Sequence, residues 1–345
     1  MMAIGLLEFI KNLILWPPVF YMLIAPGLIT IMILLIILIW AERKIAGRIQ
    51  MRYGPLEISP KIGGAIQLLA DLMRYMFQEI IIPRTVDTLP YIIAPIAGFV
   101  ISMLPIAAIP ISPMYFPSPV NNSIIVALAL TTLPPIFGIL AGWSSNNKFS
   151  LIGGARESFL VAAYELIIIL SAIGAVIIYG SPDFTQAVSA QKDLWGIVLN
   201  PISAIAFYVA VLMATGRFPF EIAEADAEIV MGAYTEYSGL MYGLSMGISY
   251  ARMFVYNLIF TLLFLGGWYP FFTVPGHTFF SYVIIPATII ILKALIVSLT
   301  MVFTRAIYAR LRIDQALGGA WKFWFLFSII GLLWGGAIVL LQGGI

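Results

Sequence analysis

The chain of 345 residues is 62% hydrophobic and only 10% charged, with a mean hydropathy of +1.04. This composition excludes an ordinary soluble domain and is typical of a polytopic membrane protein. There is no cysteine, so the chain itself cannot hold an iron–sulfur cluster or a thiolate-bound zinc ion. The net charge is only +2 and no basic run alternates with aromatic residues, so nothing indicates nucleic-acid binding.

Apolar stretches of about 20 residues, the length that crosses a bilayer as a helix, recur along the whole chain. We expect an all-α fold with about eight transmembrane helices in a single membrane domain, residues 1–345. The N-terminal run lacks the pattern of a removable signal peptide and is expected to be retained. The predicted helices lie at about 18–41, 91–112, 122–142, 158–180, 197–214, 240–267, 281–303 and 321–341.

Lysine and arginine residues are distributed unevenly between the two sides of the predicted bundle. The connections that follow odd-numbered helices carry 14 of them, whereas the opposite side carries only Lys11 and Lys192. The positive-inside rule therefore predicts that both termini lie outside and that the charged connections lie in the cytoplasm. We expect a multi-pass protein of the plasma membrane.

The first charged connection, residues 42–90, is too long to be a simple turn. From Ile62 onward its apolar positions recur at spacings of three and four, which predicts an amphipathic helix along the membrane. This helix either packs on the bundle or a partner subunit, or serves only as an anchor. The apolar positions are Ile66, Leu69, Leu72, Met73, Met76 and Phe77.

A second charged connection, residues 215–239, concentrates acidic side chains beside the membrane. Five carboxylates, against the single cation Arg217, would hold protons in a coupled way if the loop is buried, whereas a solvated loop would need no such role. Pro219 suits a helix start, and a helix there would place three of the carboxylates on one face. The five are Glu221, Glu224, Asp226, Glu228 and Glu236, and the three are Glu221, Glu224 and Glu228.

Three ionisable residues, Glu165, Arg252 and Lys293, fall inside predicted membrane helices. Each is expected to face the bundle interior and to pair, because an isolated charge in the bilayer is costly. Glu165 is a candidate proton carrier, and the alternative is a permanent structural pair with Arg252 or Lys293. The sole histidine, His277, has no cysteine or second histidine near it, so we expect no catalytic metal site.

Several long motifs occur in an order that resembles the membrane subunit of respiratory complex I known in mitochondria as subunit 1, within the NADH–quinone oxidoreductase family. They cover most of the chain and are highly specific. The motifs are AERKIAGRIQMRYGP at 41–55, GGAIQLLADLMRYMFQE at 63–79, AAYEL at 162–166, GRFPFEIAEADAE at 216–228, EYSG at 236–239, FLGGW at 264–268 and RAIYARLRIDQ at 305–315.

The resemblance implies a membrane subunit that forms much of a quinone chamber and an acidic channel coupling quinone reduction to proton translocation. By matching motif, the quinone-binding residues would be Arg43, Arg52, Asp71, Arg217, Phe220, Glu224, Tyr250 and Arg305. The proton relay would comprise Glu42, Glu165, Glu224, Asp226, Glu228 and Glu236.

The resemblance also implies that this chain works only as a subunit of an NAD(P)H- or ferredoxin-dependent quinone oxidoreductase. Quinone would be the substrate, no cofactor would be bound covalently, and iron–sulfur clusters would lie on partner subunits only. The expected partners are iron–sulfur subunits of the quinone module, antiporter-like membrane subunits and lipid. Two positions depart from the family pattern, since glutamates common in the family are replaced here by Ala214 and Ser249.

Two other functions remain open at this stage. A membrane-bound hydrogenase or sulfur-reducing complex could use a similar bundle without quinone. A stand-alone ion carrier could use Glu165, Arg252 and Lys293 as its binding site, although the chain has no internal repeat of the kind that many carriers show.

Overall fold

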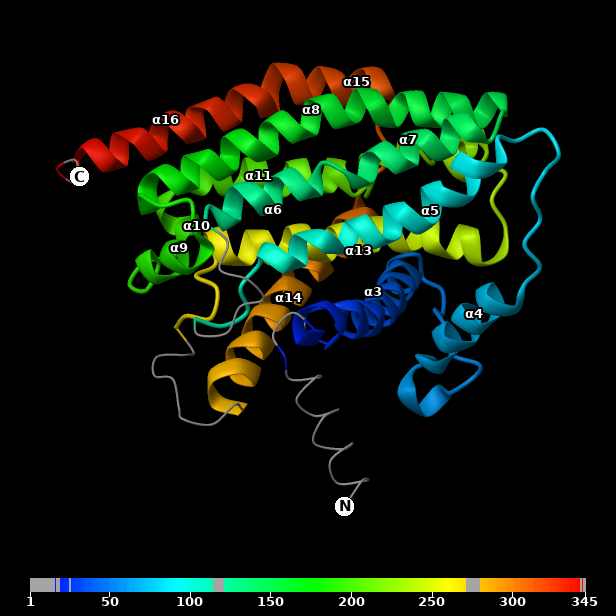
Figure 1. Cartoon of the computed structure of the whole chain (residues 1–345), viewed down its shortest axis with the longest axis horizontal. Helices are drawn as coiled ribbons and strands as arrows, with labels where there is room; N and C mark the ends of the chain where they lie inside the picture. Colours follow the sequence, from blue (N-terminus) through cyan, green and yellow to red (C-terminus); the bar gives the residue numbers. More distant parts are fainter. Residues whose placement is uncertain are drawn as a thin grey trace.

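The computed structural model describes residues 16, 19–24, 26–113, 121–270, 280–341 and 343. These residues form helices joined by loops, and none of them forms a strand (Figure 1). The principal helices are α3 (Leu28–Ile49), α4 (Ile66–Phe77), α5 (Thr88–Met103), α6 (Ser123–Thr131), α7 (Pro134–Ser144), α8 (Lys148–Tyr179), α9 (Phe184–Ala190), α10 (Gly196–Leu199), α11 (Pro201–Ala214), α12 (Asp226–Ile229), α13 (Gly239–Phe264), α14 (Ile285–Ile307), α15 (Ile313–Gly319) and α16 (Phe325–Leu341).

The predicted all-α membrane fold is confirmed. Among the described residues, six helical stretches are long and apolar enough to cross a membrane. The other two predicted runs coincide with α3, whose last turns are charged, and with the shorter α11. The six stretches are Thr88–Ala108, Ser123–Ser144, Lys148–Tyr179, Gly239–Phe264, Phe280–Ile307 and Ile313–Leu341.

Two predicted helix starts are wrong. The fourth helix begins at Lys148, ten residues before the predicted start, because the Asn147 side chain accepts a hydrogen bond from the Phe149 amide and caps it. The last helical stretch begins at Ile313 instead of about residue 321. Both errors arise because charged residues in the first turns of these helices resemble loop sequence.

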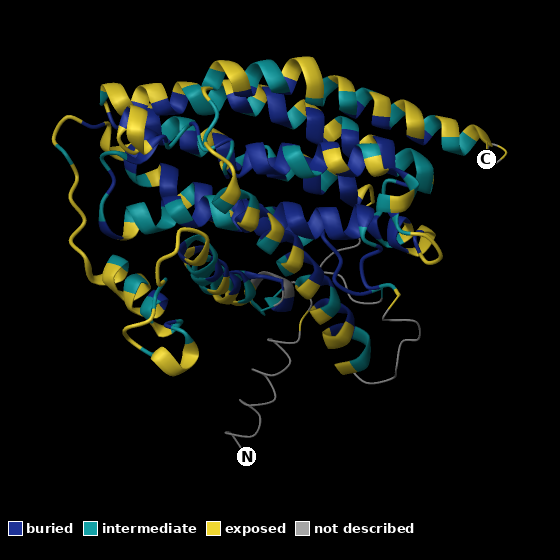
Figure 2. Cartoon of the chain, turned by 180° about the vertical axis from the view of Figure 1, so that it is seen from behind, coloured by how far each residue is buried: buried dark blue, intermediate teal, exposed yellow. Residues whose placement is uncertain are grey.

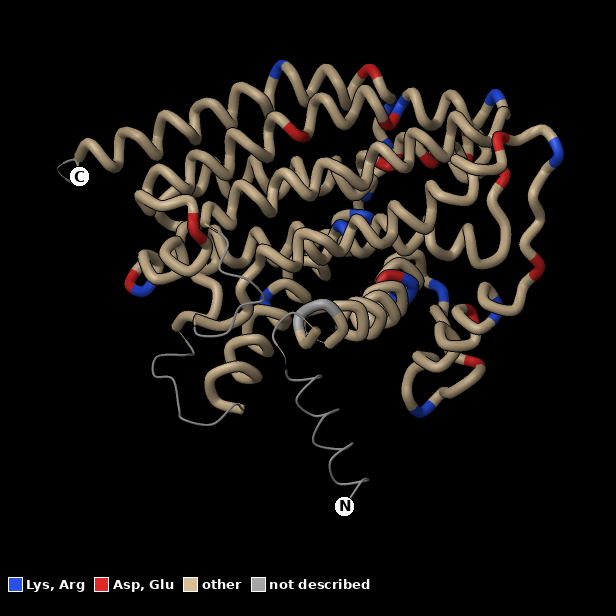
Figure 3. Tube along the Cα trace, viewed as in Figure 1, with Lys and Arg blue, Asp and Glu red and all other residues tan. Residues whose placement is uncertain are grey.

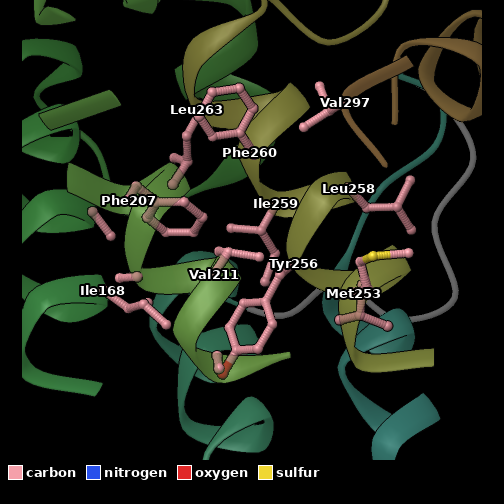
Figure 4. Packing of buried hydrophobic residues seen from close by; sticks show 14 of the residues in the cluster. Ile168, Phe207, Val211, Met253, Tyr256, Leu258, Ile259, Phe260, Leu263 and Val297 are labelled. Atoms are coloured by element: carbon pink, nitrogen blue, oxygen red, sulfur yellow. The ribbon is translucent and has the colours of Figure 1, made fainter. Parts of the chain in front are cut away.

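The centre of the bundle is α13, whose residues from Ala251 to Phe264 are all buried (Figure 2). It packs against α5, α11 and α14, while α8 packs against α7, α11 and α16. Figure 4 shows side chains of α11 and α13 interdigitating, and the rings of Phe207 and Phe260 lie 6.1 Å apart between centroids. Apolar residues also cover the outer faces of the helices, as expected for surfaces in contact with lipid.

The amphipathic helix in the first connection is present as α4. It packs on α3 and α13, with the Tyr75 and Tyr242 rings 5.9 Å apart between centroids. Its remaining apolar side chains, including Met73, Met76 and Phe77, are exposed on the isolated chain. The helix therefore packs on the bundle through one face and leaves an apolar face uncovered.

Small residues allow α8, α11 and α16 to approach closely. A Cβ atom on Gly331 of α16 would lie 2.5 Å from the Ser203 hydroxyl oxygen and 2.9 Å from the Ser203 amide nitrogen. The Asn200 side chain donates hydrogen bonds to the carbonyl oxygens of Gly331 (2.9 Å) and Gly174 (3.3 Å). Close backbone approach with a polar side chain bridging the helices is a common way to join helices in membranes.

We predict that Gly331→Val lowers the thermal stability of the protein, because the new side chain must displace the α11 backbone. The expected cost is about 1–3 kcal/mol, as for other overpacked interiors. Gly336→Val is the matched control, since a Cβ atom at Gly336 meets no atom of the described residues within 4 Å. Thermal denaturation in detergent checks this prediction, and equal melting temperatures for the two variants would contradict the proposed packing.

Candidate functional site

Charged residues of the described part of the chain lie mostly toward the end of the bundle that holds α4 (Figure 3). One of them, Glu42, is only 6% exposed near the end of α3. Its carboxylate contacts Arg217 (3.2 Å) and Arg305, and it accepts a hydrogen bond from the Tyr250 hydroxyl (2.6 Å). A buried carboxylate is costly unless it is paired and hydrogen-bonded, and here both conditions are met.

The cluster around Glu42 continues into the acidic connection. Arg305 also contacts the Glu221 carboxylate at 3.3 Å, so two guanidinium groups face two carboxylates. The Arg217 guanidinium lies 4.0 Å from the centroid of the Tyr250 ring, close enough for a cation–π interaction. Arg217 is buried, yet its Nε and Nη2 have no hydrogen-bond partner among the described residues. A buried donor without a partner is a place where water or a polar ligand can bind.

The acidic connection does not form the predicted helix. Among the described residues of this connection, α-helix is limited to the short α12, and three apolar side chains turn into the bundle at irregular spacing: Phe220, Ile222 and Ala225. The Pro219 carbonyl accepts a hydrogen bond from the Leu311 amide (2.9 Å), so the loop is held by a distant segment. Tertiary packing therefore overrides the local helical pattern, and the three carboxylates of the predicted face lie in different environments.

A second buried cluster, which sequence reasoning missed, contains Glu157 of α8. Arg252 of α13 lies 3.6 Å from the Glu157 carboxylate and donates a hydrogen bond to the Tyr164 hydroxyl at 2.8 Å. Hydropathy misses Glu157 because it assigns this residue to a connection before the helix. Asn147, a typical N-cap residue, is the signal that could have placed it within the helix.

A cavity of about 40 Å³ lies between these groups. Glu157 and Arg252 line it together with Glu221 and Glu224 of the acidic connection. A water molecule needs roughly 10–15 Å³ of such volume, so the cavity has room for one or a few waters among polar partners. The site can therefore hold protons and water inside the bundle.

Burial, and to a smaller extent the charge of Glu157, raise the pKa of Glu224 to about 7. Burial also raises the pKa of Glu221 to about 7, with the charge of Glu224 adding to the effect. Arg217 opposes both shifts without cancelling them. Carboxyl groups whose pKa lies near the working pH can both accept and release protons, which suits proton transfer.

The remaining quinone-binding candidates differ in their surroundings. Arg43 forms an ion pair with Asp71 of α4 at 2.6 Å, which joins α4 to α3. Arg52 is exposed and donates a hydrogen bond to the Gln50 side chain at 2.7 Å. Phe220 is buried and lines the cavity.

The remaining relay candidates are distributed more widely. Glu228 is exposed and pairs with Arg156, and Asp226 is exposed in α12. Glu236 accepts a hydrogen bond from the Asn147 side chain, so it is attached to the start of α8. Asp226, Glu228 and Glu236 are not among the residues that line the cavity.

The expected pairing of the three intramembrane charges is only partly confirmed. Arg252 pairs with Glu157, and Lys293 donates to the carbonyl oxygens of Leu265, Gly267 and Tyr269 at 2.6–2.8 Å. Within the described part of the chain, Glu165 forms no ion pair, and its buried Oε1 has no hydrogen-bond partner. Glu165 is therefore not held as a permanent structural pair by Arg252 or Lys293.

The described residues include no group of three or more His, Asp or Glu side chains placed to hold a metal ion. His277 lies outside the described residues.

A sequence model described as NADH dehydrogenase matches residues 22–336, nearly the whole chain. The chain belongs to this family. It is 32% identical over 298 residues to a protein of Geobacillus kaustophilus, covering 86% of each chain. It is 35% identical over 308 residues to one of Carboxydothermus hydrogenoformans, covering 88% of this chain and 85% of the relative. It is 36% identical over 313 residues to one of Dehalococcoides mccartyi, covering 91% and 84%.

Each of these relatives is named as the same subunit of NADH-quinone oxidoreductase, which confirms the resemblance found in the motifs. Ala214 and Ser249, the positions where the resemblance leads us to expect glutamate, both line the cavity beside Glu157. The carboxylates among its lining residues come from α8 and the acidic connection.

We predict that Glu224→Gln raises stability at alkaline pH. Wild-type Glu224 has a pKa of about 7 when folded against 4.5 as its ordinary value, so the folded protein holds a proton that the unfolded chain releases. The stability of the wild type should therefore fall as pH rises from about 4.5 through about 7, and the variant should lose this part of the dependence.

Melting temperatures measured from about pH 5 to about pH 8 check the direction of this change of stability with pH. The expected gain for the variant at the upper end is on the order of 2 kcal/mol. Glu57→Gln, at an exposed position, is the control. A Glu224→Gln profile parallel to that of the wild type would show that this carboxyl is ordinarily ionised.

Proposed function

We propose that this chain forms the quinone chamber of a complex I-type quinone oxidoreductase and carries the acidic groups that couple quinone reduction to proton translocation. The observation that carries the proposal is that the acidic connection contributes residues both to the cluster around Glu42 and to the cavity beside Glu157. Arg217 contacts Glu42, Glu221 contacts Arg305 and lines the cavity, and Glu224 lines the cavity. A change of charge in the cluster around Glu42 therefore acts directly on Glu221 and Glu224, the carboxyl groups that line the cavity.

The proposed quinone-binding residues supply two kinds of interaction. Apolar and aromatic groups, such as Phe220 and Tyr250, suit the ring and tail of a quinone. The guanidinium groups stabilise negative charge that develops when the quinone is reduced. The proposed set is Arg43, Arg52, Asp71, Arg217, Phe220, Glu224, Tyr250 and Arg305.

The chain does not catalyse electron transfer by itself. It has no cysteine to hold an iron–sulfur cluster, so electrons must reach the quinone from clusters on partner subunits. The quinone enters from the lipid near α3, α13 and α4, and its head group meets the partner that donates the electrons. The uncovered apolar face of α4 is available to lipid or to such a partner.

The proton relay consists of Glu42, Glu165, Glu224, Asp226, Glu228 and Glu236, which pass a change of protonation to antiporter-like partner subunits. In this arrangement residues 42–90 and 215–239 face the cytoplasm, and both termini lie outside the plasma membrane. The connections that follow odd-numbered helices together carry 14 lysines and arginines, against two on the opposite side, which supports that orientation.

We predict that Glu165→Gln and Glu228→Gln each lower the number of protons translocated per quinone reduced, because glutamine cannot carry a proton. The measurement uses the assembled complex in sealed vesicles, with quinone reduction and vesicle acidification followed together. Glu57→Gln, in an exposed part of the first connection, is the matched control and should behave as the wild type. Normal proton translocation in both relay variants would remove the relay from the proposed function.

A further inference from the structure

Glu157 and Glu224 approach the same cavity from opposite elements, α8 and the acidic connection. Their charges repel each other, and Arg252 is the cation that lines the cavity with them. Both carboxylates are partly buried beside one guanidinium, so ionisation of one disfavours ionisation of the other.

The Glu157 carboxylate is held by fewer close donors than the Glu42 carboxylate. Its shortest separation from Arg252, 3.6 Å, is longer than a hydrogen bond, in contrast to the three donors that hold Glu42. Arg252 is 7% exposed and its Nε has no hydrogen-bond partner among the described residues, although it lines a cavity large enough for water. The cavity thus places room for water beside a carboxylate with a single ion-pair partner.

Glu157 is also placed to act on Glu165. The two residues are eight positions apart on α8, about 12 Å along the helix axis. The negative charge of Glu157 acts on Glu165 through an interior of low dielectric constant, where such interactions are strong. Protonation of Glu157 removes that charge and favours the ionised form of Glu165.

We propose that Glu157 is a further proton-carrying residue, which exchanges a proton with Glu224 through water in the cavity and transmits the change to Glu165 electrostatically. This inference rests on the proposed function. In each transfer the Glu224 carboxyl becomes a carboxylate, the cavity water relays one proton, and the Glu157 carboxylate becomes a carboxyl. The groups around Glu157 in this exchange are Glu224, Arg252, Tyr164 and Tyr234.

The test compares Glu157→Gln with Glu165→Gln in the assembled complex in sealed vesicles. Glu157→Gln should lower the protons translocated per quinone reduced several-fold, as Glu165→Gln does. A loss in Glu165→Gln with normal translocation in Glu157→Gln would overturn this inference and leave the proposed function standing. Normal translocation in both would overturn this inference, and normal translocation in Glu228→Gln as well would remove the relay from the proposed function.

Tyr164→Phe distinguishes proton carrying from support of Arg252, because it removes the other partner of that guanidinium and leaves the carboxylate. Its loss of translocation should be several-fold smaller than that of Glu157→Gln, whereas a loss equal to that of Glu157→Gln would overturn the inference. The double variant Glu157→Gln/Ser249→Glu returns a carboxylate to another wall of the cavity and should regain most of the lost translocation. No recovery in an assembled double variant would also contradict the proposal.

Should Glu157→Gln fail to assemble, Glu157→Asp takes its place, since it keeps a carboxylate near Arg252. Infrared difference spectra recorded on quinone reduction should then show a protonated-carboxyl band that is shifted relative to the wild type. An unchanged spectrum would show that residue 157 does not change its protonation.

Discussion

The contact of Glu42 with two arginines and a tyrosine is the constraint on which the rest of this site depends. It joins α3, the acidic connection, α13 and α14 at one buried carboxylate. Removing one partner from such a group leaves a buried charge uncompensated, which is strongly destabilising. The acidic connection is therefore tied to the bundle at its beginning, and its following residues are held against the cavity.

The two clusters differ in how well their charges are satisfied, and this difference indicates a division of roles. Glu42 has three donors at close range, so it is suited to fix the geometry of the site. Glu157, Glu224 and Glu165 have few or no hydrogen-bond partners in the described structure, and the charge of Glu157 acts on both Glu224 and Glu165. Loosely paired buried carboxyl groups are the ones that change protonation at moderate cost.

Much of the fold could be predicted from the sequence because apolar runs of membrane-spanning length leave few alternatives. The spacing of Ile66 to Phe77 likewise predicted α4. The start of α8 could not be placed from hydropathy, since its first turns carry Lys148, Arg156 and Glu157, and this error hid Glu157 from the candidate residues. The helix predicted after Pro219 was also wrong, because burial of Phe220, Ile222 and Ala225 is decided by contacts distant in sequence.

The family could be identified from motifs, but the division between the two clusters required the structure. Sequence spacing placed Glu221, Glu224 and Glu228 on one face, whereas the folded loop sends them to Arg305, the cavity and Arg156. The sequence identified Glu165 as a charge inside a membrane helix. That it forms no ion pair among the described residues could not be predicted, because α13 and α14 direct Arg252 and Lys293 to other partners.

The central claim is that this chain works as the quinone-coupled membrane subunit of a larger complex. Mass spectrometry of the material that co-purifies with the chain, after extraction of its own membranes in mild detergent, tests this claim most directly. We expect antiporter-like subunits, iron–sulfur subunits and bound quinone. A nickel–iron hydrogenase subunit without quinone, or the chain purified alone, would contradict the account.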